Sequence, residues 1–159
     1  MSPVSAFVPV SAEQARALRA GDDLGDLPAH TAGAGLREAH GLGPADDEEA
    51  GFVALGYAGL AALLARTGAR TVLAVDLDGA QVGGTGDDFG AVVVHALRWP
   101  QVTAVFADKP AAADDLAAAR ELAAGRGLAD VADDEDVVGL VDRWDLLWYA
   151  PEELDAALG

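Results

Sequence analysis

The 159-residue chain carries 27 acidic and 10 basic side chains, for a formal net charge of −17 at pH 7, and it has no cysteine. Without cysteine it forms no disulfide, zinc–thiolate site or thiol nucleophile. Phosphate backbones and anionic lipids repel so negative a protein, so we expect neither nucleic acid nor membrane partners. The composition, 52% hydrophobic and 23% charged, is typical of a globular protein, and the length predicts one domain over residues 1–159.

A short strand is predicted over residues 6–10 (AFVPV), where Pro9 indicates a sheet edge or a strand end. The following SAEQ has the pattern of a capping box, with Ser11 as the N-cap and Gln14 three residues later. It predicts a helix that stops at Gly21. No basic flank precedes this segment, so we expect no signal peptide and a cytoplasmic protein.

A second strand is predicted over residues 27–32, followed by the longest helix, over residues 46–66. The first turn of that helix is acidic, which suits the positive end of a helix dipole. Its large apolar residues surround most of the helix, which predicts burial on more than one side. They are Phe52, Val53, Leu55, Leu60, Leu63 and Leu64.

The middle of the chain contains three apolar runs with the composition of strands. Residues 71–77 (TVLAVDL) are apolar on both faces, which predicts an interior strand. Residues 91–97 and 102–108 follow with a short turn between them, which favours an antiparallel pair. Pro110 is tolerated in a first helical turn, so a helix is predicted from there to about Ala124.

The C-terminal part begins with an acidic stretch, residues 129–138, to which no element is assigned. Residues 146–150 (LLWYA) are predicted to form a final strand, and residues 151–158 a short closing helix. The order of elements predicts an α/β or α+β fold, with helices packed on a mixed sheet of about five or six strands.

The most suggestive motif is Asp76-Leu77-Asp78-Gly79 after a buried strand. In haloacid-dehalogenase-like phosphatases such a strand ends in Asp-x-Asp, where the first carboxylate attacks phosphorus and the second is the general acid/base. This pattern assigns Asp76 as nucleophile, Asp78 as acid/base and Lys109 as the phosphate anchor. Mg²⁺ would be held by Asp76 with Asp133 or Asp134, from a distal acidic group that also includes Asp136.

Several features favour a simple turn instead. Ala80 follows the glycine where that superfamily usually has threonine or valine, and the glycine-rich segment leads into another strand rather than a helix. Asp-Gly is among the commonest turn signals, and aspartates fall close together by chance in so acidic a chain. The favoured interpretation is therefore that Asp78-Gly79 ends a strand.

Other catalytic or binding signals are weak. The segment GGTGDDFG matches neither a P-loop nor a dinucleotide-binding turn, and no calcium-loop spacing is present. His30, His40 and His95 are scattered along the chain, and His95 is expected to be a core or interface residue rather than a base. No cofactor is predicted.

Aromatic residues gather near the C-terminus, at Trp144, Trp148 and Tyr149. They are expected to fill the core where the chain closes. The alternative is an aromatic contact surface for a partner or a second subunit.

Four segments of the chain resemble an uncharacterised actinobacterial family of similar length. They are FVPVSAEQARAL, VLAVDL, VTAVFAD and DLLWYAPEEL, and Leu147-Trp148-Tyr149 is the most specific part. The family starts with a YVP-like strand and a leucine-rich helix. It has no assigned activity or catalytic residues, and its region matching Asp76 to Gly79 varies, so the resemblance weakens the phosphatase interpretation.

The leading hypothesis is a small non-catalytic protein that acts through protein contacts, as a homo-oligomer or with an unidentified protein partner. The second is a Mg²⁺-dependent phosphate-ester hydrolase that uses Asp76 and Asp78. A third, which rests on the net charge alone, is an acidic protein that binds a basic partner.

Overall fold

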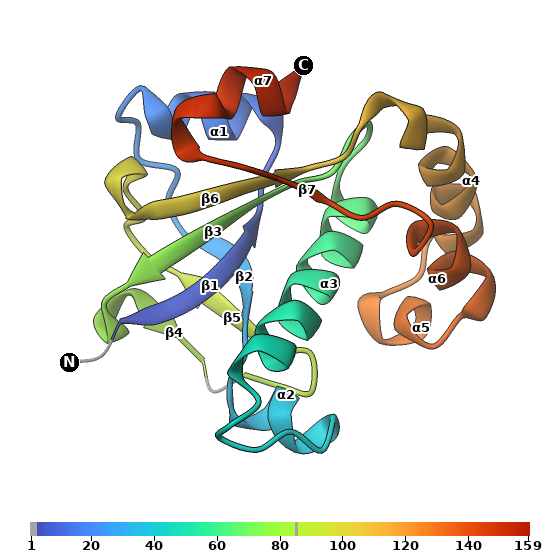
Figure 1. Cartoon of the computed structure of the whole chain (residues 1–159), viewed down its shortest axis with the longest axis horizontal. Coiled ribbons are helices and arrows are strands. Elements are labelled where there is room, and N and C mark those ends of the chain that lie inside the picture. Colours follow the sequence, from blue (N-terminus) through green and yellow to red (C-terminus); the bar gives the residue numbers. More distant parts are fainter. Residues whose placement is uncertain (1–2, 85) are drawn as a thin grey trace.

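A computed structural model describes residues 3–84 and 86–159. Within these residues the chain forms seven strands and seven α-helices (Figure 1). The strands are β1 Val4–Pro9, β2 Leu27–Thr31, β3 Thr71–Leu77, β4 Val82–Gly83, β5 Ala91–Val94, β6 Val102–Ala107 and β7 Leu147–Tyr149. The helices are α1 Ala12–Arg19, α2 Ala34–Ala39, α3 Asp47–Ala65, α4 Ala113–Ala123, α5 Leu128–Ala132, α6 Glu135–Val141 and α7 Leu154–Leu158.

All seven described strands belong to one sheet, in the order β4-β5-β2-β1-β3-β6-β7. The predicted combination of helices and one sheet in a compact domain is confirmed, with more strands than the expected five or six. Every neighbouring pair among the described strands is antiparallel. No parallel pair therefore contributes to the sheet, although a mixed sheet was expected.

The predicted hairpin between residues 91–97 and 102–108 is wrong. β5 pairs with β2 and β4, whereas β6 pairs with β3 and β7, so the three strands β2, β1 and β3 separate them in the sheet. The physical reason is that β5 ends at Val94 and Ala96 takes a left-handed conformation, with φ of 51°. That conformation redirects the chain before a hairpin turn can form.

β1 lies at the centre of the sheet, paired with β2 on one side and β3 on the other. Pro9 is its last residue, so the prediction of a strand end is confirmed and that of a sheet edge is wrong. Residues 11–14 form the predicted capping box. The backbone N–H of Gln14 donates to Ser11 Oγ, and that of Ser11 donates to Gln14 Oε1, each at 3.0 Å.

The two faces of the sheet bury different helices. On one face α1 and α7 pack on a large apolar cluster whose buried strand residues come from β1, β2, β3, β5 and β6 and include Val8, Leu73 and Val105. On the opposite face of β1 lies Phe7, which packs towards α3. Figure 1 shows α1 and α7 together at the top of the sheet and α3 crossing beside it.

α3 approaches the sheet closely because a ridge of alanine faces the core. Ala50, Ala54, Ala58 and Ala62 recur every four residues and are almost completely buried. Leu60 and Leu63 pack on the other side, against α4, α5 and α6. The expected burial on more than one side is therefore found, although Phe52 is exposed.

By length and composition α3 could also span a membrane, and 39% of its most apolar stretch is buried inside the fold. Burial between a sheet and a helical layer selects the same apolar composition. Here α3 is the element that joins both parts of the core, since it contacts β1, β2 and β3 as well as α4 and α5.

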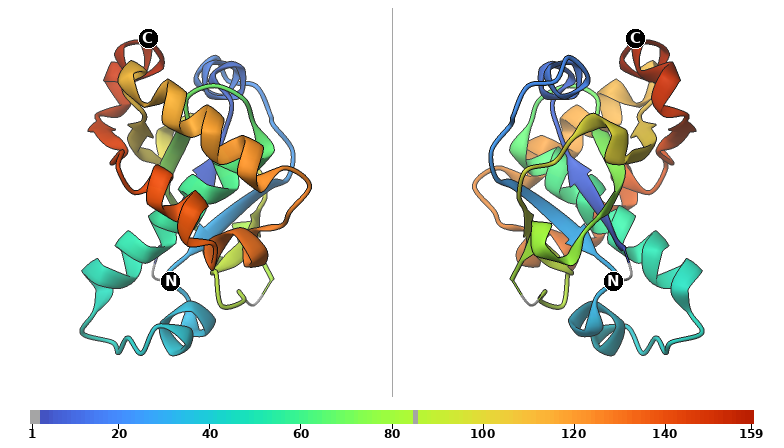
Figure 2. Two further views of the ribbon diagram at one scale, coloured as in Figure 1. Left: turned by 90° about the vertical axis from the view of Figure 1, so that its right-hand side faces the viewer. Right: turned by 90° about the vertical axis from the view of Figure 1, so that its left-hand side faces the viewer.

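The acidic stretch after α4 is ordered as the two short helices α5 and α6, where the sequence assigned no element. Asp134 is the N-cap of α6, and its Oδ1 accepts from the backbone N–H groups of Asp136 and Val137. Val131, Val137 and Val141 are buried against α3 and α4. The left panel of Figure 2 shows α4, α5 and α6 as a layer of their own.

Candidate functional site

The Asp-x-Asp-Gly segment forms a local turn at one end of β3. Asp76 lies within β3 with an exposed side chain, and its Oδ1 accepts from Ser5 Oγ at 3.0 Å. Asp78 starts the short 3₁₀ turn η1 (Gly79–Gln81), where its backbone N–H donates to Gln81 Oε1 at 3.1 Å. The favoured interpretation of Asp78-Gly79 as the end of a strand matches this geometry.

Lys109 lies at the opposite end of β3 from Asp76. Because β3 and β6 are antiparallel, Ala107 pairs with Thr71, the first residue of β3 (Figure 1). Asp76 lies five residue steps further along β3 than Thr71, which corresponds to about 16 Å of extended strand. A lysine this far away cannot hold a phosphate that Asp76 attacks.

The distal acidic residues Asp133, Asp134 and Asp136 also have local structural roles. Asp133 ends α5, and the Asp134 carboxylate accepts from Arg126. That hydrogen bond holds the pKa of Asp134 below its usual range. Asp136 lies in the first turn of α6. Among the described residues, no three histidine, aspartate or glutamate side chains are close enough to hold a metal ion.

The three histidines lie in separate environments. His30 is buried, its Nδ1 is 2.7 Å from the carbonyl oxygen of Phe89, and burial lowers its pKa. His40 Nε2 lies 2.8 Å from the Tyr57 hydroxyl. The half-buried His95 places Nδ1 2.7 Å from Asp26 Oδ1. The ring nitrogens of the three histidines therefore face three different partners, a backbone carbonyl oxygen, a phenolic hydroxyl and a carboxylate.

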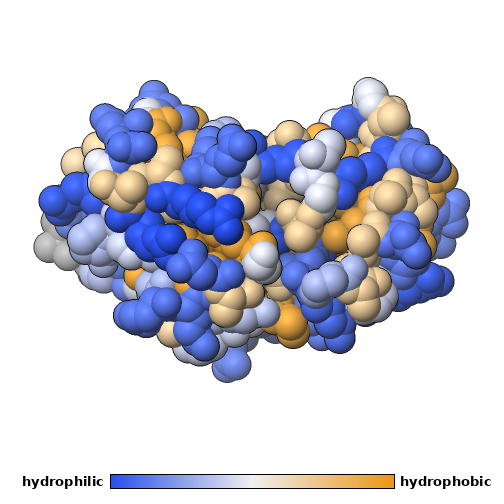
Figure 3. Space-filling view, turned by 90° about the horizontal axis from the view of Figure 1, so that it is seen from above, coloured by the Kyte–Doolittle hydropathy of each residue, from blue (hydrophilic) through white to orange (hydrophobic). Residues whose placement is uncertain are grey.

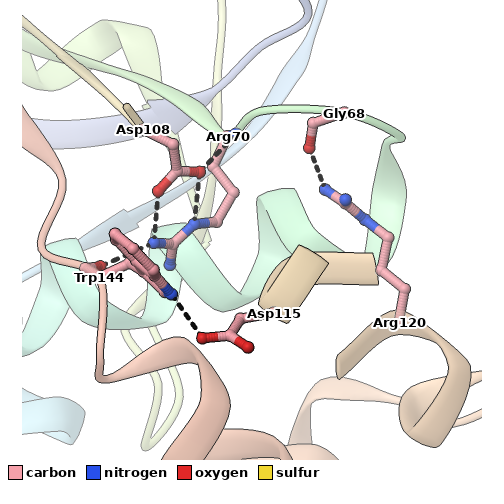
Figure 4. Close-up of polar contacts among 6 residues, drawn as sticks. All are labelled: Gly68, Arg70, Asp108, Asp115, Arg120 and Trp144. Carbon is pink, nitrogen blue, oxygen red and sulfur yellow. Dashed lines mark hydrogen bonds and ion pairs between the residues drawn. The ribbon is translucent and has the colours of Figure 1, made fainter. Parts of the chain in front are cut away.

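The other end of β3 carries a buried polar network that the sequence did not predict (Figure 4). Arg70 immediately precedes β3 and Asp108 immediately follows β6. Their side chains are 4% and 0% exposed, and the guanidinium donates to both carboxylate oxygens, at 2.9 Å from Nε and 2.7 Å from Nη2. The backbone N–H of Arg70 also donates to Asp108, at 2.7 Å. A bidentate buried pair of this kind fixes the two strand ends together.

Trp144 extends this network to the helical layer. Its carbonyl oxygen accepts from Arg70 Nη2 at 3.0 Å, and its indole Nε1 donates to Asp115 Oδ2 at 2.8 Å (Figure 4). Lys109 Nζ lies 5.4 Å from the centre of its ring, within the range of a cation–π contact. Trp144 is half-buried and packs with the apolar cluster around α4, so it fills the core only in part.

A groove of 340 Å³ opens beside this network, between α3 and residues 141–146. Arg70 and Trp144 line it together with Phe52, Gly56, Gly59 and Leu146. Gly56 and Gly59 leave room in the wall that α3 provides, because neither has a side chain. Phe52 at the rim is 73% exposed.

β7 continues from the end of the groove and presents further apolar residues. Leu147 and Trp148 are 38% and 61% exposed. Trp148 pairs in register with Phe106 of β6, whose ring makes an edge contact with Phe7. Tyr149, in contrast, packs against the large core cluster. The two residues therefore take opposite roles, as their alternation along a strand requires.

One face of the molecule, seen in Figure 3, is mostly hydrophilic. On that face hydrophobic residues appear as separate patches between hydrophilic ones. This distribution is expected of a chain with a net charge of −17. Phe52 and Trp148 are the two most exposed large hydrophobic residues among those the structure describes.

A protein-family model, described as a family of unknown function (DUF6912), matches residues 4–158. The chain belongs to this family. DUF6912 therefore covers almost all of the sequence, including the groove and β7, as the resemblance to an uncharacterised family predicted. No curated protein and no solved structure matches the chain.

Proposed function

We propose that this member of DUF6912 is a non-catalytic cytoplasmic domain that acts through protein contacts. The observation that carries the proposal is the apolar surface left exposed by Phe52, Leu147 and Trp148. Large aromatic residues are enriched where proteins bind one another, because they bury much area at little cost in conformational entropy. Large apolar residues that are exposed on an otherwise strongly acidic surface indicate a contact site.

A second copy of the chain is the contact that β7 favours. β7 is the last strand of the sheet, and only β6 pairs with it among the described strands. Its outer edge offers free backbone N–H and C=O groups, the usual template for adding a strand. A two-fold symmetric contact would use the same patch on both copies, with Leu147 and Trp148 at its centre.

The net charge opposes this association at low salt, since two copies each carry −17. Salt screens repulsion between exposed charges beyond about 10 Å at 0.1 M. We therefore expect the homo-oligomer to strengthen as the salt concentration rises, the reverse of an assembly held by ion pairs.

Light scattering coupled to size-exclusion chromatography tests this proposal. We expect a mass above that of the 16.1 kDa monomer at high protein concentration. Trp148→Glu should give the monomer, because it places a charge at the centre of the contact. Leu122→Glu, an equivalent change at an exposed residue of α4, should leave the mass unchanged. A monomer at every protein and salt concentration would contradict self-association.

The alternative of a Mg²⁺-dependent phosphate-ester hydrolase lacks comparable support. It requires Asp76, Asp78 and Lys109 to converge on one phosphate, and the antiparallel β3 and β6 hold Asp76 and Lys109 at opposite ends. The exposed Asp76 carboxylate instead accepts from Ser5 Oγ, and the backbone N–H of Asp78 donates to Gln81 Oε1 in the turn that ends the strand.

A further inference from the structure

We propose that the groove beside α3 binds an extended, basic segment of a partner protein. One large apolar side chain of that segment would enter the groove, and Arg70 Nη1 would donate to one of its backbone carbonyl oxygens. This inference rests on the proposed function, since it names the chemistry of one partner. Three observations carry it: the glycines of α3 that leave the groove open, the Arg70 Nη1 donor that has no hydrogen-bond partner among the described residues, and the carboxylates at the rim.

The groove exists because α3 carries glycine where a helix does not favour it. Glycine weakens a helix interior, so its presence calls for a reason. A Cβ on Gly59 would lie 3.2 Å from Arg70 Nη1 and 3.5 Å from Leu146 Cδ1. A Cβ on Gly56 would meet nothing within 4 Å, so open space lies above that residue. With a volume of 340 Å³, the groove is at the small end of ligand sites, which suits a side chain better than a cofactor.

Arg70 brings an unused donor to this groove. Its side chain is 4% exposed, and Nε and Nη2 are bonded to Asp108 and to the carbonyl oxygen of Trp144. Nη1 makes no hydrogen bond to any residue that the structure describes, and Arg70 lines the groove. Nη1 is not fully buried, so a carbonyl oxygen in the groove can replace water there and accept a charge-assisted hydrogen bond. Because Asp108 already offsets the charge, Nη1 suits a neutral carbonyl oxygen.

The charges around the groove favour a cationic partner. Asp142 and Asp145 line it, and Glu48 and Glu49 stand one turn before Phe52 on the same side of α3. Within the described part of the chain none of these four carboxylates makes an ion pair. Asp142 is also the C-cap of α6, where the helix dipole is negative. The neighbouring Arg143 pairs with Asp115 instead, with 3.6 Å between Nη1 and Oδ2.

These charges decide between two acceptors for Arg70. A free carboxylate would suit a guanidinium, but it would have to approach between uncompensated acids. A backbone carbonyl flanked by lysine or arginine side chains meets no such repulsion. The expected segment therefore has a large apolar residue with basic residues on both sides of it.

The test is selection from a displayed library of random linear peptides on the immobilised full chain, followed by fluorescence anisotropy with synthetic peptides. We expect enrichment of a large apolar residue flanked by lysine or arginine, with affinity that falls as salt is added. Gly56→Leu fills the groove from an open position and should weaken binding about tenfold or more. Gly51→Leu is the matched control, since it makes the same change on α3 where no groove lies, and it should bind as wild type does.

Gly59→Ala tests the part of Arg70, because its methyl group would crowd Nη1 without removing the buried pair. It should weaken the same peptides, with thermal unfolding to verify that the variant is folded. Peptides that bind Gly56→Leu as tightly as wild type would overturn the groove site while leaving the proposed function intact. Enrichment of acidic sequences would overturn the inferred partner chemistry. If no peptide is enriched on the wild-type chain, the groove proposal fails. If the wild type is also monomeric throughout, the proposed function fails with it.

Discussion

The two ends of β3 differ in two ways: one carries a recognisable sequence motif at the surface, and the other carries a buried ion pair without any motif. At its C-terminal end, Asp76 and Asp78 form a motif known from phosphatases, yet their hydrogen bonds go to Ser5 and Gln81 at the surface. At its N-terminal end, Arg70 has no motif, yet it is nine-tenths buried and bonded to Asp108 and Trp144. The comparison shows that burial together with specific hydrogen-bond partners identifies a structured polar site better than a short sequence motif does.

The largest effect is expected from breaking the buried pair. Asp108→Ala leaves Arg70 charged and without its carboxylate, which should lower the free energy of unfolding by about 3–5 kcal/mol. Urea unfolding followed by circular dichroism measures the change. The double variant Arg70→Met with Asp108→Leu removes both charges, so it should be more stable than the single variant. If the single variant is as stable as wild type, the pair does not hold the strand ends together.

A smaller loss is expected at the link to the helical layer. Trp144→Phe removes the hydrogen bond from Nε1 to Asp115 while keeping most of the ring, which should cost about 1 kcal/mol. Trp148→Phe is the matched control, because that side chain is exposed and its change should fall within about 0.5 kcal/mol. Equal losses in the two variants would mean that the indole hydrogen bond contributes nothing.

His30 extends the comparison to pH, because it is buried like Arg70 but has a titratable ring. Burial lowers the pKa of His30 from 6.5, so below that value the unfolded chain takes up a proton that the folded protein resists. Stability should therefore fall as pH drops below about 6.5. His30→Gln should reduce this slope. At about pH 8 His30 is neutral in both the folded and the unfolded protein, so the difference in the free energy of unfolding between wild type and variant there gives the packing cost alone. An unchanged slope would contradict the prediction.

The smallest effect is expected at the motif itself. Asp76→Asn and Asp78→Asn alter exposed side chains and should each change the free energy of unfolding by less than about 0.5 kcal/mol. Thermal unfolding with Mg²⁺, and with Mg²⁺ plus beryllium fluoride, should shift wild type and Asp76→Asn alike. An added beryllium fluoride stabilisation that is present in wild type and absent in Asp76→Asn would revive the hydrolase hypothesis.

The burial of the three candidate interface residues also depends on their tertiary surroundings rather than on a sequence pattern. The sequence predicted that Trp144, Trp148 and Tyr149 fill the core, and this prediction is wrong for Trp148, which is 61% exposed. The structure packs the half-buried Tyr149 against the core, gives the indole of Trp144 a hydrogen bond to Asp115 and leaves Trp148 exposed. Strand alternation separates Trp148 from Tyr149, but only the position of β7 at the sheet edge leaves Trp148 uncovered.

The sequence by itself determined features whose causes are local. The capping box at Ser11, the interior strand at residues 71–77, the turn at Asp78 and the closing strand and helix all depend on residues a few positions apart or on a simple periodicity. The tertiary structure alone decided the partners of β5 and β6, the order of the acidic segment as two helices, and the pairing of Arg70 with Asp108, 38 residues away. The groove also belongs to this second group. These features depend on which strands become neighbours, and the energy that selects the neighbours is spread over the whole core rather than written in any one segment.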